Sequence, residues 1–351
     1  MIVAGAGVKY SGAYEALNNL AEAMHVPVAT SLNAKDAILD NNPLSVGVVG
    51  TYSRRSANQV VAEADLVIFV GTRAGGMTTH FWTIPAKGTS TIQIDIDPLV
   101  NGRNYPTDVS IVGDARVTLE KMNELNIPVP KERVEWLKQV KAICTSYKID
   151  FKEVYESDAY PIRPERIVNE LSNGMPKNAV IVVDTGHSGM WMGGMFEKRH
   201  EDQSYIRSAG HLGWAFPAAL GAKCGAPHRP VVCFMGDLGF WYHMAEVETA
   251  VRAGINTITI INNNNSGNMA KGSISAIYDD QPTKESQDIW VQNKINFAKI
   301  AENMGAVGIR VEKANEIAPA FQKALKLDKP VVIDIATDIE IVAPKAWEPK
   351  A

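Results

Sequence analysis

The sequence predicts an α/β protein made of two consecutive parallel-sheet domains, each with helices on both faces of its sheet and therefore three layers. Short β-branched runs alternate with helix-like segments along the chain, and this alternation stops once and then resumes. The length is consistent with two domains, because 351 residues with 46% hydrophobic side chains are enough to form about two cores.

The first half of the chain carries the first series of alternating segments. Strands that alternate with helices are joined by crossover connections, which produce a parallel sheet. The predicted strands are residues 1–4, 26–30, 66–70 and 91–96, and the predicted helices are residues 13–24 and 57–64.

The alternation of strands and helices is interrupted after this series. Residues 126–130 are proline-rich, and residues 132–148 form a charged amphipathic stretch that predicts a connecting helix. The sequence therefore predicts a first domain at residues 1–125, a linker with a helix at residues 126–160 and a second domain at residues 161–351.

The second domain repeats the alternation. The predicted helices are residues 164–172, 213–224, 243–253 and 296–304, and the predicted strands are residues 179–183, 231–235, 257–261 and 331–335.

Composition excludes several classes of binding partner. A formal charge of −4 gives no broad basic field for a nucleic acid or an anionic membrane surface. The three cysteines, Cys144, Cys224 and Cys233, form neither a disulfide framework nor a paired zinc motif. The chain opens with a short apolar run that does not match a signal peptide, and no apolar segment approaches the roughly 20 residues that cross a bilayer. We therefore expect a cytoplasmic protein that binds a small molecule, without a nucleic-acid or membrane partner.

Polar residues follow two of the predicted strands of the second domain. Gly236 and Asp237 come at the end of one strand, and Asn264 lies 27 positions after Asp237, at the end of the next. Ligands of parallel α/β sheets bind outside these carboxyl ends. A carboxylate and an amide oxygen are ligands that Mg²⁺ accepts together with a phosphate. The spacing therefore predicts a magnesium site that clamps a diphosphate.

This segment resembles the metal motif of the thiamine diphosphate (ThDP) enzymes, in which Gly-Asp-Gly is followed about 26 residues later by Asn-Asn. The resemblance implies that Asp237, Asn264 and the Ser266 carbonyl hold Mg²⁺, with Asn263 as the first asparagine of the pair. The run of four asparagines leaves this register open by one residue. The cofactor-binding residues that it implies here are Gly236, Asp237, Leu238, Gly239, Asn264 and Gly267.

Leu238 departs from the family pattern, because the third residue of the motif is usually glycine. The departure puts the close approach of the backbone to the diphosphate in doubt. Some acyl-CoA-processing relatives also lack this glycine.

Two upstream segments resemble the same family. The segment from Asp184 to Trp191 is similar to the diphosphate-contacting loop of acetolactate synthases, which implies that Gly186, His187 and Ser188 lie near the phosphates. Histidine and hydroxyl groups can donate hydrogen bonds to phosphate oxygens.

The segment from residue 210 to residue 221 is similar to the glycine-rich stretch before the cofactor helix of the family. It implies that Gly210 and His211 contact the cofactor and that Leu212 supports its two rings in a V-shaped conformation. Taken singly, each of these residues has a structural alternative: a turn glycine, a helix-capping asparagine, a loop histidine or a core leucine.

The first domain resembles the middle domain of acetolactate synthases, at residues 5–12, 67–73 and 94–98. That domain can hold a flavin through residues like Arg73 and Asp95. The alternative is an empty scaffold, because Gly5 and Gly7 do not complete a dinucleotide-binding motif.

No catalytic residue is assigned in the sequence. Family members usually begin with a further, pyrimidine-binding domain, whose glutamate activates the cofactor. Glu246 and Glu248 lie inside the metal motif and are interpreted as structural. We therefore expect a separate pyrimidine-binding subunit and a hetero-oligomer built from dimers, with a fragment of a longer protein as the alternative.

The resemblance implies an acetolactate synthase-like carboligase that acts on 2-oxo acids. A ThDP-dependent decarboxylase, or a 2-hydroxyacyl-CoA or acyloin lyase, is the second possibility, and a non-catalytic scaffold subunit is the third. Residues 269–290 are polar and contain glycine, and are expected to form a lid. Trp241 and Trp290 are candidates either for the pocket wall or for buried packing.

Overall fold

The computed structural model describes residues 1–125, 127–208 and 210–349. Contacts divide the chain into two compact units. Unit 1 comprises residues 1–152, residues 197–199 and the described residues from 345 onward, and unit 2 comprises residues 153–196 and 200–344. The expected linker at residues 126–160 contains two helices, α5 (Lys131–Asp150) and α6 (Lys152–Tyr155), and residue 126 lies outside the described residues.

Unit 1 is an α/β unit whose described residues form a six-stranded sheet in the order β3-β2-β1-β4-β5-β6. Every paired strand in it is parallel to its neighbour. Its strands are β1 (Ile2–Ala4), β2 (Val28–Thr30), β3 (Ser45–Val48), β4 (Leu66–Val70), β5 (Ser90–Asp95) and β6 (Val109–Val112).

The helices of unit 1 bury apolar faces against this sheet, and Leu17, Val60 and Leu119 are fully buried in its core. They are α1 (Ala6–Tyr10), α2 (Tyr14–Met24), the 3₁₀ helix η1 (Leu32–Ala37), α3 (Arg55–Ala62), α4 (Ala115–Asn123) and α5 (Lys131–Asp150); α6 (Lys152–Tyr155) follows at the sequence boundary of the units.

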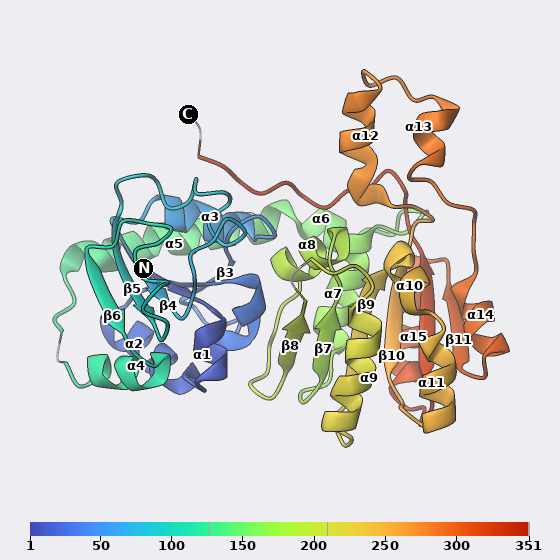
Figure 1. Ribbon diagram of the computed structural model, residues 1–351, viewed down its shortest axis with the longest axis horizontal. Coiled ribbons are helices and arrows are strands. Elements are labelled where there is room, and N and C mark those ends of the chain that lie inside the picture. The colour runs from blue at the N-terminus through green and yellow to red at the C-terminus, as the bar shows by residue number, and fades with distance from the viewer. Residues whose placement is uncertain (126, 209, 350–351) are drawn as a thin grey trace. The chain divides into compact units, whose positions relative to one another are not determined.

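Unit 2 has the same layered architecture. Its described residues form a six-stranded parallel sheet in the order β11-β12-β10-β9-β7-β8 (Figure 1). The chain leaves β7 toward one edge and returns on the other side of it at β9, so the β7/β9 border is a topological switch point, where α/β sheets bind ligands. Its strands are β7 (Val180–Val183), β8 (Ser204–Arg207), β9 (Val231–Gly236), β10 (Ile258–Asn263), β11 (Val307–Val311) and β12 (Val331–Ala336).

Helices cover both faces of the unit 2 sheet. Cys233 and Met235 of β9 pack in one core cluster with apolar side chains of α9, α11 and α14, whereas Val232 and Phe234 alternate with them and are buried on the opposite face. The helices are α7 (Pro164–Gly174), α8 (His187–Gly194), α9 (Ala215–Gly225), α10 (Asp237–His243), α11 (Glu246–Ala253), η2 (Asn268–Ala270), α12 (Lys271–Ile277), α13 (Lys284–Asp288), α14 (Phe297–Asn303), η3 (Ala314–Glu316) and α15 (Ile317–Ala324).

The predicted fold class is confirmed, as are the predicted strands, each of which lies in the interior of a sheet. The strands that the sequence did not predict are β3, β6, β8 and β11, the four edges of the two sheets in the described part of the chain. Along β6 no residue is fully buried, and along β11 only Val311 is. Edge strands lack a neighbour on one side, so their apolar pattern is weaker.

Three local features of the structure were not predicted. The segment from Asp184 to Trp191 was expected to be a loop, but α8 begins at His187. A separate short helix, α10, precedes the predicted helix at residues 243–253, and residues 269–290 contain α12 and α13. Of the helices in the described ranges, none is both long and apolar enough to cross a membrane.

Candidate functional site

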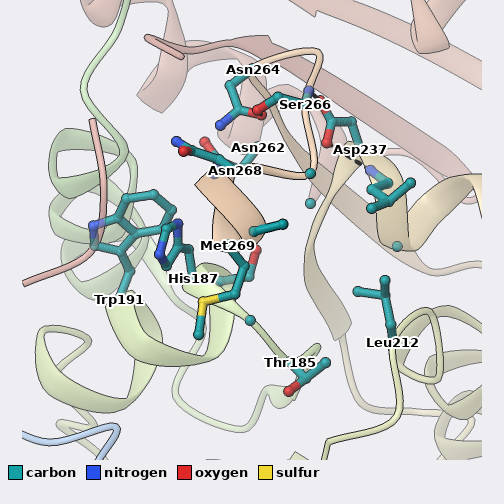
Figure 2. Close-up of a pocket in the computed structure, with 17 residues that line it drawn as sticks. Thr185, His187, Trp191, Leu212, Asp237, Asn262, Asn264, Ser266, Asn268 and Met269 are labelled. Atoms are coloured by element: carbon teal, nitrogen blue, oxygen red, sulfur yellow. Dashed lines mark hydrogen bonds between the residues drawn. The ribbon is translucent and has the colours of Figure 1, made fainter. Parts of the chain in front are cut away.

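A pocket opens at the carboxyl ends of β7, β9 and β10, next to the switch point of the unit 2 sheet (Figure 2). Its volume is about 340 Å³. The predicted cofactor and metal residues that line it are Gly186, His187, Ser188, Leu212, Gly236, Asp237, Leu238, Gly239, Asn264, Ser266 and Gly267. Gly210 and His211 are exposed and are not part of its lining.

Asp237 is the charged group of the pocket. It is the first residue of α10, directly after β9, and it is 2% exposed. Its Oδ1 accepts the backbone N–H of Leu238 at 2.6 Å, and its Oδ2 accepts that of Ser266 at 3.1 Å. Burial raises the pKa of Asp237 to about 6, although these N–H donors oppose the shift. A cation beside this carboxylate would favour its charged form.

The four asparagines at the end of β10 have different surroundings. Asn262 and Asn264 line the pocket, whereas the side chain of Asn263 donates to Asp334 Oδ1 at 2.8 Å. This alternation is that of a β-strand, in which successive side chains point to opposite faces. Asn265 adopts a left-handed conformation with φ of 55°, which turns the chain so that Ser266 Oγ donates to Asn264 Oδ1 at 2.8 Å. Asn264 is thus the asparagine that lies with Asp237 and Ser266 (Figure 2).

Asp184 joins the end of β7 to the segment that carries Leu212. It is 1% exposed, and its Oδ2 accepts the backbone N–H of Gly213 at 2.9 Å. Burial raises the pKa of Asp184, and the Gly213 N–H partly opposes this shift. Gly239 leaves space for the Asp184 carboxylate, because a Cβ at residue 239 would lie 2.3 Å from Asp184 Oδ2. The backbone of Gly213, with φ of 85°, likewise approaches Gly239 O too closely for a side chain.

His187 forms one wall of the pocket together with Trp191, one helical turn later on α8. Their rings are in edge contact with centroids 5.5 Å apart (Figure 2). Burial lowers the pKa of His187, so its ring is neutral at pH 7. Its Nδ1 and the Trp191 Nε1 are buried without a hydrogen-bond partner among the described residues.

Sequence reasoning missed several lining residues. Trp191 could have been found by its helical spacing from His187, and Asn262 by its strand spacing from Asn264. Thr185 directly precedes Gly186, and Met269 and Ala270 begin the segment that was expected to form a lid. Nothing in the sequence pattern identified Asn268, which the turn after Gly267 brings to the pocket. The missed lining residues are Thr185, Trp191, Asn262, Asn268, Met269 and Ala270.

Both candidate tryptophans lie outside the lining of the pocket. Trp241 packs edge-on against Phe297, with ring centroids 5.2 Å apart, and donates to Gln292 Oε1 at 3.1 Å. Trp290 lies under the ammonium group of Lys271, 5.4 Å from its ring centroid, and its carbonyl accepts the Gly267 N–H.

The donor set fits a magnesium diphosphate. One buried carboxylate and one amide oxygen come from neighbouring strand ends, and buried polar atoms without partners, on His187, Trp191, Asn262 and Asn268, surround the pocket. Among the described residues, no group of three His, Cys, Asp or Glu side chains could hold a metal. A cation in this pocket would therefore need amide and backbone oxygens beside Asp237.

Leu238 occupies the place of the motif glycine without closing the pocket. A Cβ at Gly267 would lie 3.1 Å from Leu238 Cδ2, so the missing side chain of Gly267 makes room for the leucine. The glycine usually found at the third motif position is thus replaced by a leucine that packs beside the turn after β10.

The switch point of the unit 1 sheet fits a flavin poorly. At its switch point, between β1 and β4, a Cβ on Gly7 would lie 2.6 Å from Gly71 Cα, and a Cβ on Gly5 would lie 2.2 Å from Gly71 O. These glycines allow the start of α1 to touch the chain after β4, at the place where a dinucleotide-binding fold holds its ligand.

Comparison with known proteins defines the class of this fold and site. Residues 184–335 match the family model described as the thiamine pyrophosphate enzyme C-terminal TPP binding domain, and residues 1–122 match the thiamine pyrophosphate enzyme central domain. Thiamine pyrophosphate is another name for ThDP. The chain belongs to the thiamine pyrophosphate enzyme family.

Within that family the chain is related to acetolactate synthase large subunits. A probable acetolactate synthase large subunit of Methanococcus aeolicus is 33% identical over 355 residues, covering 96% of this chain and 58% of the relative. That of Methanocaldococcus jannaschii is 31% identical, with 96% and 57% covered. A putative thiamine pyrophosphate-containing protein of Bacillus subtilis is 32% identical, with 95% and 56% covered. The chain thus spans under two thirds of the length of these relatives.

Proposed function

We propose that the chain holds ThDP and Mg²⁺ in the unit 2 pocket and is part of an acetolactate synthase-like carboligase that acts on 2-oxo acids. The observation that carries this proposal is the meeting of Asp237, Asn264 and Ser266 at the ends of β9 and β10. The relationship to acetolactate synthase large subunits supports the reaction class.

Each group of pocket residues has a proposed role. Asp237, Asn264 and the Ser266 carbonyl hold the cation, and Gly186, His187 and Ser188 bind the diphosphate. Ser188 and neutral His187 lie at the start of α8 and can donate hydrogen bonds to phosphate oxygens without a formal positive charge. The remaining proposed cofactor contacts are Gly210, His211, Leu212, Gly236, Leu238, Gly239 and Gly267.

Leu212 supplies the apolar support for the cofactor rings, and its position is set by the Asp184–Gly213 hydrogen bond. The bound cofactor supplies an electron sink for C–C bond cleavage and formation. The protein contributes orientation, and the apolar side chains of Leu212 and Leu238 limit the access of water to the pocket.

The activating glutamate is proposed to come from a pyrimidine-binding domain on a separate polypeptide, in a hetero-oligomer built from dimers. The relatives are named as large subunits, which supports an assembly of unlike subunits in general. Affinity purification from the native source tests this point. Recovery of a stable complex with a second chain is expected, whereas recovery of one long polypeptide that carries both parts would reject the separate subunit.

Product analysis tests the reaction. The native assembly, supplied with ThDP, Mg²⁺ and pyruvate, is expected to join two pyruvate molecules into a C5 acyloin acid with release of one CO₂. Release of an aldehyde without the C5 acid would favour a decarboxylase or a 2-hydroxyacyl-CoA or acyloin lyase, for which Leu238 is the motivating departure. Absence of ThDP binding in calorimetry would favour a non-catalytic scaffold.

Unit 1 is proposed to be a scaffold and not a flavin or adenine-nucleotide site, because Gly7 and Gly71 contact each other at its switch point. A visible flavin absorption band in the purified native protein, lost on denaturation and filtration, would contradict this.

A further inference from the structure

We propose that Asp334 and Asn263 are positioning residues for the metal-binding turn, defined as residues 263–267. Neither residue lines the pocket, and both are fully buried. The inference rests on the proposed function, since it assigns these two residues to the cation site of the same pocket.

Asp334 lies on β12, where it is the strand neighbour of Ile261 on β10. From this position its Oδ1 accepts the Asn263 side-chain N–H at 2.8 Å, while its Oδ2 accepts the Phe297 backbone N–H at 2.7 Å. Arg310 Nη1 on β11 lies 2.7 Å from the same Oδ2. The carboxylate thus connects three consecutive strands and the first residue of α14.

Asn263 links the Asp334 carboxylate to the turn through its side-chain hydrogen bonds. Its Nδ2 also donates to Ile295 O at 2.9 Å, and its Oδ1 accepts the Asn265 N–H at 3.2 Å. Asn263 therefore uses both ends of its amide, and its orientation is determined by its partners.

The opposite side of the turn is held by the segment before α14. Asn265 Oδ1 accepts the Ile295 N–H at 3.0 Å, and Asn265 O accepts the Gln292 N–H at 2.7 Å. These contacts hold Asn265 in its left-handed conformation, which brings Ser266 N to Asp237 Oδ2. Without the Asp334–Asn263 hydrogen bond, the side chain of Asn263 would lose a partner that holds the first residue of the turn in position.

The physical reason for this support is geometric. A cation that is shared between two strand ends requires its ligand atoms within a few tenths of an ångström, and outer hydrogen-bond partners hold metal ligands in place. Losing such a partner typically weakens metal affinity by about 10- to 100-fold.

Asn263→Ala in the full chain is the principal test, because it leaves Asp334 paired with Phe297 and Arg310. We expect Mn²⁺ affinity, measured by electron paramagnetic resonance with ThDP present, to fall by about 10- to 100-fold. Asp334→Asn is expected to cause a similar loss. Glu165→Gln is the matched control, since it also removes the charge of a buried carboxylate that pairs with an arginine, Arg163, in unit 2. It should lower the free energy of unfolding and leave Mn²⁺ affinity unchanged.

Hydrogen–deuterium exchange without any ligand provides the second measurement. In both variants the backbone amides of Ser266 and Gly267 should exchange faster, whereas in Glu165→Gln they should not. Wild-type exchange at these amides in Asn263→Ala would overturn the inference, as would wild-type Mn²⁺ affinity in that variant. If neither the wild-type chain nor its native assembly binds Mn²⁺ with ThDP present, the proposed function is rejected, and the exchange result still decides the positioning role.

Discussion

Asp237 Oδ2 accepts the backbone N–H of Ser266 across 3.1 Å, although the two residues are 29 positions apart in the chain. This contact joins the end of β9 to the turn after β10, so that a carboxylate, an amide side chain and a backbone carbonyl can converge on one ion.

Replacing the carboxylate should abolish cation binding. Asp237→Asn removes the charged group of the proposed cation site, and we expect Mg²⁺ affinity in the presence of ThDP to fall at least 100-fold, or roughly 3 kcal/mol. Isothermal titration calorimetry measures this loss. Asp328→Asn is a suitable control, because Asp328 is exposed and precedes β12 at the opposite end of the strand. Equal Mg²⁺ affinity of Asp237→Asn and wild type would show that Asp237 does not bind the cation.

Cation binding should depend on pH near 6. Burial raises the pKa of Asp237 from its ordinary 3.8 to about 6, so without a cation the carboxyl group is protonated below that pH. Since Mg²⁺ binds the charged form, its affinity should be constant above pH 7 and fall by about tenfold per pH unit below pH 6. Titrations at pH 5, 6, 7 and 8 measure this dependence. A constant affinity from pH 5 to 8 would contradict it.

Leu212 should affect the cofactor more than the fold. Leu212→Ala removes apolar contact in the pocket and is expected to weaken ThDP binding roughly tenfold, or about 1.4 kcal/mol. Leu212→Met, which preserves volume and apolarity, should keep the wild-type affinity within about threefold. Fluorescence titration with ThDP at saturating Mg²⁺ compares the two variants. If the alanine variant binds ThDP as the wild type does, Leu212 does not support the rings.

Gly239 should tolerate no side chain. The Cβ of Gly239→Ala would lie 2.3 Å from Asp184 Oδ2 and would displace the acceptor of the Gly213 N–H. We expect the free energy of unfolding to decrease by about 1–3 kcal/mol, as in overpacked cores. Gly221→Ala is the control, because Gly221 lies in α9 with open space around its Cα and should gain about 0.5–1 kcal/mol.

Urea unfolding followed by circular dichroism gives both free energies. Equal stability of Gly239→Ala and wild type would show that Asp184 can move aside without loss.

The sequence predicted the interior of both sheets better than their edges. β9 and β10 were predicted because buried parallel strands are nearly continuous apolar runs. β6 and β11 escaped prediction because partly exposed edge strands mix polar and apolar residues. The helix α8 escaped because Gly189, Gly193 and Gly194 give it a weak helical signal, and tertiary packing offsets this propensity.

For the site, the sequence by itself determined which residue types occur at the strand ends and their spacing, since Asp237 and Asn264 are separated by one crossover. It could not determine which of the four asparagines lies beside Asp237 and Ser266, because each has the same chemistry. Only the tertiary structure decided that: Asp334 on β12 pairs with Asn263, and strand alternation then leaves Asn264 on the side of Asp237. The physical reason is that a hydrogen bond between residues 71 positions apart depends on which strands are neighbours, and no local pattern records that.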